Sequence, residues 1–246
     1  MRIIEARKSL TDDRLKNLVI ECVDTLKRKG FDVTMSDLAL ETSDSTTTLG
    51  SMKPPEYPLA PYTLTLSKYL SNDTDENIKN TIYHELCHYL QFKELVKRGI
   101  ADMSPLKGLV WSNKYNLTRA QKNDYIGHGD LWKSIAKDVG AAVGMEFSRL
   151  AAAEEAPGFY KAVDDAAKYI IRCRNCGNRL TFMRKTDFVK DPNINQYDYM
   201  VRIEKIPEAW IEGRASKEAI EKYKSTYEWR CGQCGKGGDW EIIKNG

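Results

Sequence analysis

Residues 84–88 read His-Glu-Leu-Cys-His, inside the longer stretch TIYHELCHYLQ at residues 81–91. Side chains four positions apart lie on one face of an α-helix, because each residue turns the helix by about 100°. Two imidazoles on one face can bind the same metal ion, and imidazole is a common ligand of zinc. The stretch therefore predicts a helix that carries two ligands of a metal site.

The residues around this motif predict a helix over residues 74–95. Thr74, Asp75 and Glu76 are typical of a helix start, where acidic groups meet the positive end of the helix dipole. Apolar residues then recur at intervals of three and four positions. They are Ile78, Ile82, Leu86, Tyr89 and Leu90.

Other parts of the chain add helices and short strands. Similar spacing of apolar residues predicts a helix at 11–29 and another that begins near His128, whereas 31–35 and 62–66 suit short strands. We therefore expect an α+β fold in which helices pack on a small sheet. Residues 98–125 show no clear period, which predicts a long loop between two helices.

A change of composition divides the chain. Residues 153–166 are small and acidic and are interpreted as a linker. The linker would separate a first domain at residues 1–152 from a second domain at residues 167–246.

A catalytic zinc ion needs three protein ligands and an open position, so a third donor must come from another part of the chain. The chain contains only three histidines, and the third, His128, lies 40 positions after His88. The extended pattern H-E-x-x-H-x-x-G-x-x-H does not fit, because Gln91 and Glu94 occupy its glycine and last-histidine positions. His128 is the leading candidate, and a distant glutamate is the alternative.

The cysteines indicate a second metal site. Four of the six form two C-x-x-C pairs, Cys173 with Cys176 and Cys231 with Cys234, and strand-like stretches flank each pair. This spacing is typical of a structural zinc ion with four thiolate ligands; free or redox-active thiols are the alternative. The pairs are 55 positions apart, beyond the usual about 15–20, so we expect an insertion at 186–226.

The composition bounds the location of the protein. No apolar run approaches the about 18 residues that span a bilayer, and no apolar stretch follows the first basic residues as it would in a secretion signal. Paired cysteines with metal-binding spacing favour a reducing compartment. We expect a cytoplasmic protein with no membrane partner, nucleoid-associated in a bacterium or nuclear in a eukaryote.

The positive charge gathers toward the C-terminal end. Residues 166–246 contain 16 Lys and Arg against 11 Asp and Glu, a difference of +5. Basic and aromatic side chains alternate there, which suits contact with phosphates and stacking on bases. The alternative is that the aromatic residues cover a small core and the charges are ordinary surface. The residues concerned are Arg172, Arg174, Arg179, Arg184, Lys185, Tyr169, Phe182, Tyr227, Trp229 and Arg230.

Residues 11–150 resemble SprT-like zinc metalloproteases, the family that includes the Spartan proteases. The resemblance rests on TLTLSKYL at 63–70, the helix containing TIYHELCHYLQ, and GHGDLWKSIAKDVG at 127–140, which follow one another in the family's order. It implies a zincin-like core followed by a C-terminal zinc ribbon. The gap before the last motif is longer than is typical of the family, so 98–124 is interpreted as an insertion.

The resemblance also implies roles for individual residues. His84, His88 and His128 would bind a catalytic zinc ion, and Glu85 would be the catalytic base that activates the attacking water. A second, structural zinc ion would lie between the four cysteines. The implied function is a zinc endopeptidase that acts on DNA-bound or DNA-crosslinked proteins, with single-stranded or damaged DNA as a partner.

Two other functions stay open. The chain could be a nucleic-acid-binding zinc protein whose histidine site is structural or vestigial. It could also be a metal hydrolase of non-protein amides.

Overall fold

The computed structural model describes most of the chain. The described residues are 9–57, 59–104, 108–112, 114, 116–147, 156–193, 216–218, 231, 233–235 and 239–245. The chain divides into two compact units, residues 1–162 and residues 163–246. Helices and small sheets are both present, so the α+β class predicted from the sequence is confirmed.

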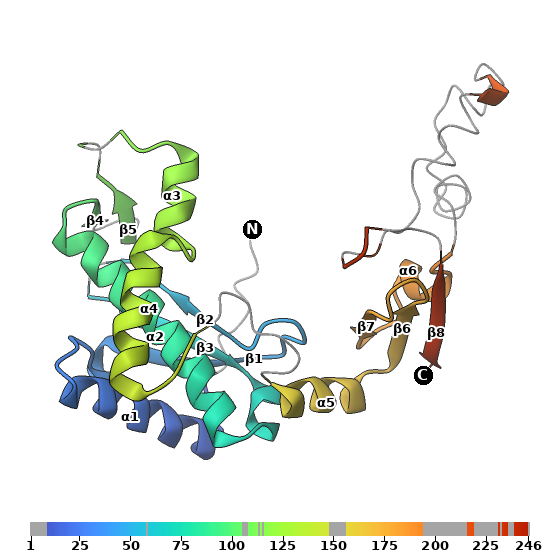
Figure 1. Ribbon diagram of the computed structural model, residues 1–246, viewed down its shortest axis with the longest axis horizontal. Coiled ribbons are helices and arrows are strands. Elements are labelled where there is room, and N and C mark those ends of the chain that lie inside the picture. The colour runs from blue at the N-terminus through green and yellow to red at the C-terminus, as the bar shows by residue number, and fades with distance from the viewer. Residues whose placement is uncertain are drawn as a thin grey trace. The chain divides into compact units, whose positions relative to one another are not determined.

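The first unit contains a three-stranded sheet in the order β1-β3-β2 (Figure 1). β1 (Leu38–Ser43) runs parallel to the central strand β3 (Tyr62–Ser67), and β2 (Gly50–Lys53) runs antiparallel to β3. Leu64 and Leu66 of β3 are fully buried, as expected of alternate residues in a strand that is covered by helices. The strand predicted at 62–66 is confirmed, and β2 lies at an edge of the sheet.

The strand predicted at 31–35 is wrong. Met35–Asp37 forms a short 3-10 helix, in which the N–H of Asp37 donates to the carbonyl of Thr34 at 3.2 Å. β1 begins only at Leu38, the first residue that pairs with β3. Val33 is buried without joining the sheet. The apolar pattern correctly indicated burial, but the availability of a partner strand decided where the strand begins.

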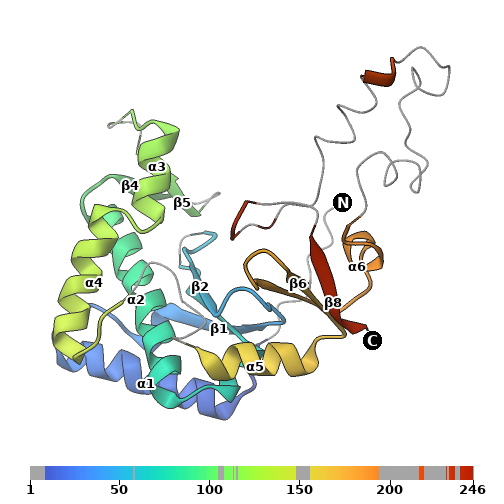
Figure 2. The same ribbon diagram turned by 45° about the vertical axis from the view of Figure 1, so that its right-hand side comes forward.

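Helix α2 (Asp75–Lys97) lies in the middle of the first unit. It contacts α1 (Asp13–Arg28), α4 (Asp130–Val143) and the edge strand β2 (Figures 1 and 2). None of the helices in the described part of the chain combines the length and the apolarity needed to cross a membrane.

The sequence at the start of α2 explains why the helix begins there. The Thr74 side chain accepts a hydrogen bond from the N–H of Asn77 at 3.2 Å, which caps the first turn. Ile78, Ile82 and Leu86 follow at helical spacing and are fully buried. The helix predicted at 74–95 is confirmed.

The stretch between α2 and α4 is not the plain loop that its irregular pattern predicted. β4 (Ala101–Ser104) and β5 (Gly108–Trp111) form an antiparallel hairpin, and α3 (Arg119–Ile126) follows. The Thr118 hydroxyl accepts from the N–H of Gln121 at 3.3 Å, and Gln121 Oε1 accepts from the N–H of Thr118 at 2.9 Å, which makes a capping box. Strands of four residues are too short to show a period, so the sequence pattern missed them.

Helix α5 (Pro157–Ala166) occupies most of the stretch interpreted as a linker. The buried carboxylate of Asp73 holds its first turn, because Oδ2 accepts the N–H of Phe159 at 3.0 Å. Gly158 allows a close approach, since a Cβ there would lie only 2.3 Å from the carbonyl oxygen of Asn72. These contacts fix the beginning of α5 to the first unit.

The second unit is a three-stranded antiparallel sheet in the order β7-β6-β8. β6 (Tyr169–Cys173) pairs on one side with β7 (Arg179–Phe182) and on the other with β8 (Trp240–Asn245). Val189 of the short helix α6 (Asp187–Lys190) belongs to the same small core as Trp240.

The strands predicted around the first cysteine pair and after the second pair are present. The strand expected before the second pair, residues 225–230, and most of the insertion at 186–226 lie outside the described residues.

Replacing Gly158 by alanine should destabilise the first unit, although alanine has the higher helix propensity. The new Cβ would overlap the Asn72 carbonyl and the Asp73 backbone, so α5 would have to shift. We expect the free energy of unfolding to fall by about 1–3 kcal/mol in urea denaturation followed by tryptophan fluorescence.

Lys161→Ala, at an exposed position of the same helix, is the matched control and should change that free energy by less than about 0.5 kcal/mol. An unchanged or raised stability of Gly158→Ala would contradict the close packing of α5.

Candidate metal centres

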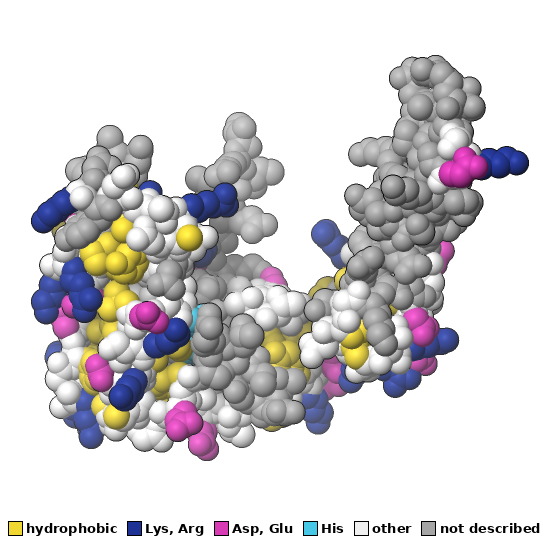
Figure 3. Space-filling model, turned by 45° about the horizontal axis from the view of Figure 1, so that its top comes forward, with side chains coloured by type: hydrophobic (Ala, Val, Ile, Leu, Met, Phe, Trp, Pro, Cys, Tyr) yellow, Lys and Arg dark blue, Asp and Glu magenta, His cyan; other side chains and the backbone are white. Residues whose placement is uncertain are grey.

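Three histidine side chains meet in the first unit. His84 and His88 lie one turn apart on α2, and His128 lies in the turn between α3 and α4. Nε2 of His128 is 2.9 Å from Nε2 of His84 and 3.2 Å from Nε2 of His88. All three side chains are half-buried, and only a small cyan area of histidine is visible in Figure 3. The three histidines predicted as ligands are therefore brought together.

The spacing of these nitrogens suits a tetrahedral ion. Zinc–nitrogen bonds of about 2.0–2.1 Å place two ligand nitrogens about 3.3 Å apart in a tetrahedron. The separations of 2.9 and 3.2 Å are close to that distance. Among the described residues this group of possible ligands consists of three histidines, and it contains no glutamate, the alternative third ligand. Three protein donors are the usual number in catalytic zinc sites.

Trp132 of α4 packs against all three imidazoles. Its ring centroid lies 4.8 Å from that of His84, 5.7 Å from that of His88 and 4.5 Å from that of His128. The Trp132 side chain is buried, so it limits the room in which the three rings can rotate. Burial lowers the pKa of His88 to about 4, which makes this imidazole neutral at pH 7. Neutral imidazole is the form that binds metals.

Glu85 is a buried acid next to the histidines. Its carboxylate accepts a hydrogen bond from the backbone N–H of Met52 in β2. Burial raises the pKa of Glu85 to about 8, although the Met52 hydrogen bond acts in the opposite direction. Gly50 lets β2 approach α2, because a Cβ there would lie 3.1 Å from Cγ of Glu85. The edge strand therefore holds this carboxyl group in place.

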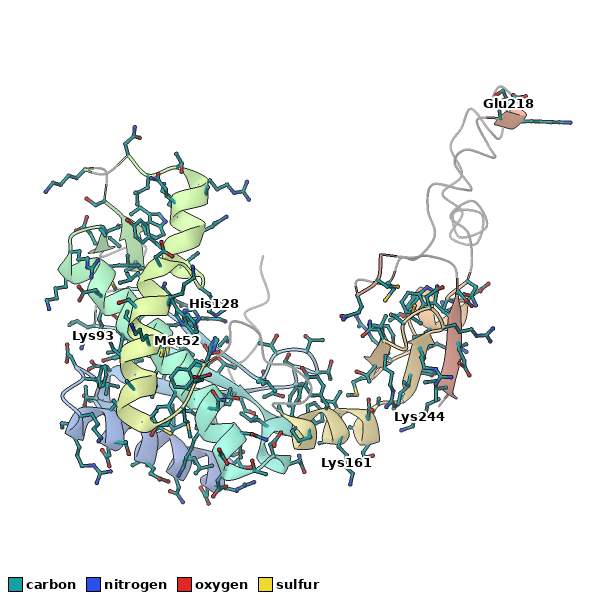
Figure 4. All side chains as sticks on the ribbon, viewed as in Figure 1. Met52, Lys93, His128, Lys161, Glu218 and Lys244 are labelled. Carbon is teal, nitrogen blue, oxygen red and sulfur yellow. The ribbon has the colours of Figure 1, made fainter. Side chains whose placement is uncertain are left out.

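A cavity of about 400 Å³ opens beside these side chains. Strand β2 contributes to its wall, and Figure 4 shows Met52 of this strand near His128. Apart from Glu85 and the imidazoles, the described lining side chains have no ionisable group other than the phenol of Tyr160. They are Thr47, Thr48, Leu49, Ser51, Met52, Asn77, Asn80, Thr81, Phe92, Ile126 and Tyr160. Away from the three histidines and Glu85, the described walls of the cavity are therefore uncharged apart from this ionisable phenol.

Four cysteine side chains form a second cluster in the second unit. Sγ of Cys173 lies 3.8 Å from Sγ of Cys234, and Sγ of Cys176 lies 3.6 Å from Sγ of Cys231. All four sulfurs lie within 4.8 Å of one another. The two predicted C-x-x-C pairs are therefore brought together across 55 positions of sequence.

The two cysteine pairs have the same local backbone. The N–H of Gly177 donates to the carbonyl of Cys173 at 2.8 Å, and the N–H of Gly235 donates to the carbonyl of Cys231 at 2.8 Å. Both glycines have positive φ, 77° and 70°, a conformation that glycine adopts without strain. The sequence therefore folds each pair into the same tight turn.

The sulfur distances suit four thiolates around one zinc ion. Zinc–sulfur bonds of about 2.3 Å place two sulfurs about 3.8 Å apart in a tetrahedron, whereas a disulfide bond is only about 2.05 Å long. The distances of 3.6 and 3.8 Å agree with the zinc geometry. Backbone N–H groups of Cys234 and Gln233 lower the pKa of the Cys231 thiol, which favours the thiolate that a metal needs.

Five of the ten basic and aromatic residues singled out in the second unit have structural partners in the described part of the chain. Ion pairs join Arg172 to Glu241, Arg174 to Asp239 and Arg179 to Asp164. Tyr169 is part of the small core, and Phe182 packs against it. These residues favour the alternative of a covered core with ordinary surface charges. Tyr227, Trp229 and Arg230 lie outside the described residues.

Two residues of the histidine site were not found as site residues from the sequence. Gln91 lies three positions after His88 on α2, and its Oε1 atom is 2.8 Å from Nδ1 of His88. Helical spacing from a motif histidine is the signal that could have revealed it. Gly50 lies in a distant strand, and nothing in the sequence connects it with Glu85.

Metal analysis of the purified chain should find about two zinc ions per molecule, one for each cluster. His128→Ala should remove one ion and leave the cysteine site filled, and Cys176→Ser should remove the other. Cys22→Ala is the matched control, because Cys22 is buried outside both clusters and should not affect the metal content. Two tightly bound ions in the His128 variant would contradict the histidine site.

Comparison of the chain with protein-family models, with curated proteins and with solved structures found no match. Function has to be inferred from the chemistry of the three imidazoles, the buried carboxyl group and the four thiols.

Proposed function

We propose that the chain is a zinc-dependent endopeptidase of the SprT-like kind, with a zincin-like core and a C-terminal zinc ribbon. The main support is one juxtaposition: three imidazole nitrogens and the buried Glu85 beside one cavity with an edge strand in its wall. A structural zinc site has no need of a carboxylic acid beside it, whereas a hydrolytic site needs a group that moves protons.

In the proposed reaction Glu85 moves a proton. Zinc held by His84, His88 and His128 would supply a Lewis acid that polarises a carbonyl group and acidifies water. Glu85 would take a proton from the water whose oxygen bonds to the carbonyl carbon. The same carboxyl group would then donate that proton to the amide nitrogen as the carbon–nitrogen bond breaks.

The edge strand supports a peptide as the substrate. Among the described residues β2 pairs only with β3, so the other edge of β2 offers the backbone groups that are not already bound, as the N–H of Met52 is to Glu85. An extended peptide can add to such an edge by backbone hydrogen bonds, independent of its side chains. A small non-protein amide has no use for this edge, which makes it the less favoured substrate class.

A vestigial or purely structural histidine site is the second alternative. Such sites usually have four protein ligands and no adjacent cavity. Here the group of possible ligands among the described residues has three members, and a cavity of about 400 Å³ lies beside it. These observations favour a working site.

The DNA-related part of the proposal has a narrower basis. It rests on the resemblance and on the charge of residues 166–246, where 16 basic residues outnumber 11 acidic ones. The ion pairs of Arg172, Arg174 and Arg179 reduce the number of cations available to phosphates. DNA-bound or DNA-crosslinked proteins are proposed as substrates on the basis of the resemblance and this charge, and DNA is a separate variable in the activity assay.

Glu85→Gln should abolish peptide cleavage while keeping the fold and both metal ions. We expect at least a roughly 100-fold loss in the rate of cleavage of a DNA-binding protein, measured with and without single-stranded DNA. Glu76→Gln, an exposed position on the same helix, is the matched control and should keep the rate. Equal cleavage by the wild type and Glu85→Gln under all DNA conditions would rule out the proposed function.

Peptides that are uncharged around the scissile bond should be cleaved fastest. The described lining side chains provide no cation, and Glu85 is the single carboxylic acid among them. Transfer of a charged side chain into such a site is unfavourable. Peptides with Lys or Asp next to the bond should have a lower kcat/KM than the matched Ala peptides, measured by mass spectrometry of the products. A preference for a charged neighbour would contradict this description of the cavity.

A further inference from the structure

Gln91 is a buried amide that lies within hydrogen-bond distance of His88 and of the residue before His128. Its side chain is fully buried on α2, three positions after His88. Oε1 lies 2.8 Å from Nδ1 of His88, and Nε2 donates to the backbone carbonyl of Gly127 at 2.9 Å. Gly127 is the residue before His128. One amide group therefore links a ligand on α2 with the turn that carries another ligand.

The chemistry of these partners decides which end of the amide faces which partner. A backbone carbonyl such as that of Gly127 can only accept a hydrogen bond, so the NH₂ group of Gln91 must face it. The amide oxygen then faces Nδ1 of His88. An oxygen can only accept there, so Nδ1 must carry the proton. In neutral imidazole the lone pair is then on Nε2.

The Nε2 atom of His88 is the one that faces the cluster, at 3.2 Å from Nε2 of His128. Gln91 therefore presents His88 in the tautomer that can bind a metal through Nε2. An isolated imidazole would exchange between both tautomers, so part of the population would have a hydrogen where the metal must bind.

The other hydrogen bond of Gln91 acts on the position of His128. Gly127 is held from two directions, because its N–H donates to the carbonyl of Asn123 at 2.9 Å and its carbonyl accepts from Gln91. The next residue, His128, places Nε2 at 2.9 Å from Nε2 of His84. The turn is thus tied both to α3 and to α2.

We propose that Gln91 is a positioning residue of the zinc site: it fixes the tautomer of His88 and ties the His128 turn to α2. This inference rests on the proposed zinc-binding role of the histidines. It goes beyond that role because it assigns the geometry of two ligands to one side chain that binds no metal. Groups that orient metal ligands in this way commonly change metal affinity by about 10–100-fold when they are removed.

Two substitutions separate the roles of the two ends of the amide. Gln91→Met has nearly the same length and provides neither hydrogen bond. Gln91→Glu keeps an oxygen that accepts from Nδ1–H of His88, but its ionised form has no hydrogen for the Gly127 carbonyl. Ile78→Val, a small truncation in the buried first turn of α2, controls for a general loss of stability.

The first readout is the zinc affinity of the histidine site, measured by competition with a chelator while the cysteine site stays filled. We expect Gln91→Met to weaken zinc binding by about 10–100-fold, Gln91→Glu to weaken it less, and Ile78→Val to leave it unchanged. Equal affinity of Gln91→Met and the wild type would overturn the proposal, as would equal losses in Gln91→Met and Ile78→Val.

The second readout is the ring N–H signal of His88 in the zinc-loaded, ¹⁵N-histidine-labelled protein. The chain has only three histidines, so each ring can be assigned by single substitutions. We expect Nδ1–H of His88 to exchange slowly with water in the wild type and faster in Gln91→Met. A wild-type His88 that binds zinc through Nδ1, or whose Nδ1–H exchanges freely, would overturn the proposal even if Gln91→Met failed to fold.

Both readouts are independent of peptide cleavage. A chain that binds zinc as described but cleaves no peptide would refute the proposed function and leave the role of Gln91 intact. Peptide cleavage that depends on Glu85, together with a zinc affinity that is unchanged in Gln91→Met, would support the proposed function and refute the role of Gln91.

Discussion

The turn of helix α2 is the constraint on which the rest of the structure depends. Each residue rotates the helix by about 100°, so His84 and His88 share one face while Glu85 lies on another. The histidine face meets Trp132 and His128, and Glu85 meets strand β2. Both faces must therefore be covered at once, and the central position of α2 between α1, α4 and the sheet provides this cover.

The two clusters meet the cost of burying polar groups in different ways. Imidazoles, a carboxyl group and thiols lose favourable contacts with water when they are buried, and a bound metal compensates for this loss. The first unit has a large apolar core, so its histidine site can leave a cavity beside the ligands. In the described part of the second unit, one core cluster contains six buried residues, two of which are cysteines. There the four thiolates with their metal would take over part of the role of a core.

The sequence predicted the parts that depend on local spacing. The motif helix, the strand at 62–66 and both cysteine turns follow from intervals of two, three or four residues, and α2 and β3 lie where those intervals placed them. The strand at 31–35 was wrong because a strand also needs a partner, and the β4–β5 hairpin was missed because its strands are four residues long. The contact of Gly50 with Glu85 and the docking of α5 on Asp73 join segments that are far apart in sequence. No local pattern indicates such contacts.

The most direct test of the central claim asks whether the histidine site keeps an open position for a substrate. Cobalt can replace zinc in both clusters, and the visible spectrum of each cobalt ion reports the number and kind of its ligands. Titration with acetohydroxamate, a small ligand that binds open metal positions, should change the bands of the three-histidine site and leave those of the four-thiolate site unchanged. A histidine-site spectrum that does not respond to the ligand would show a closed structural site and would contradict the proposed hydrolytic function.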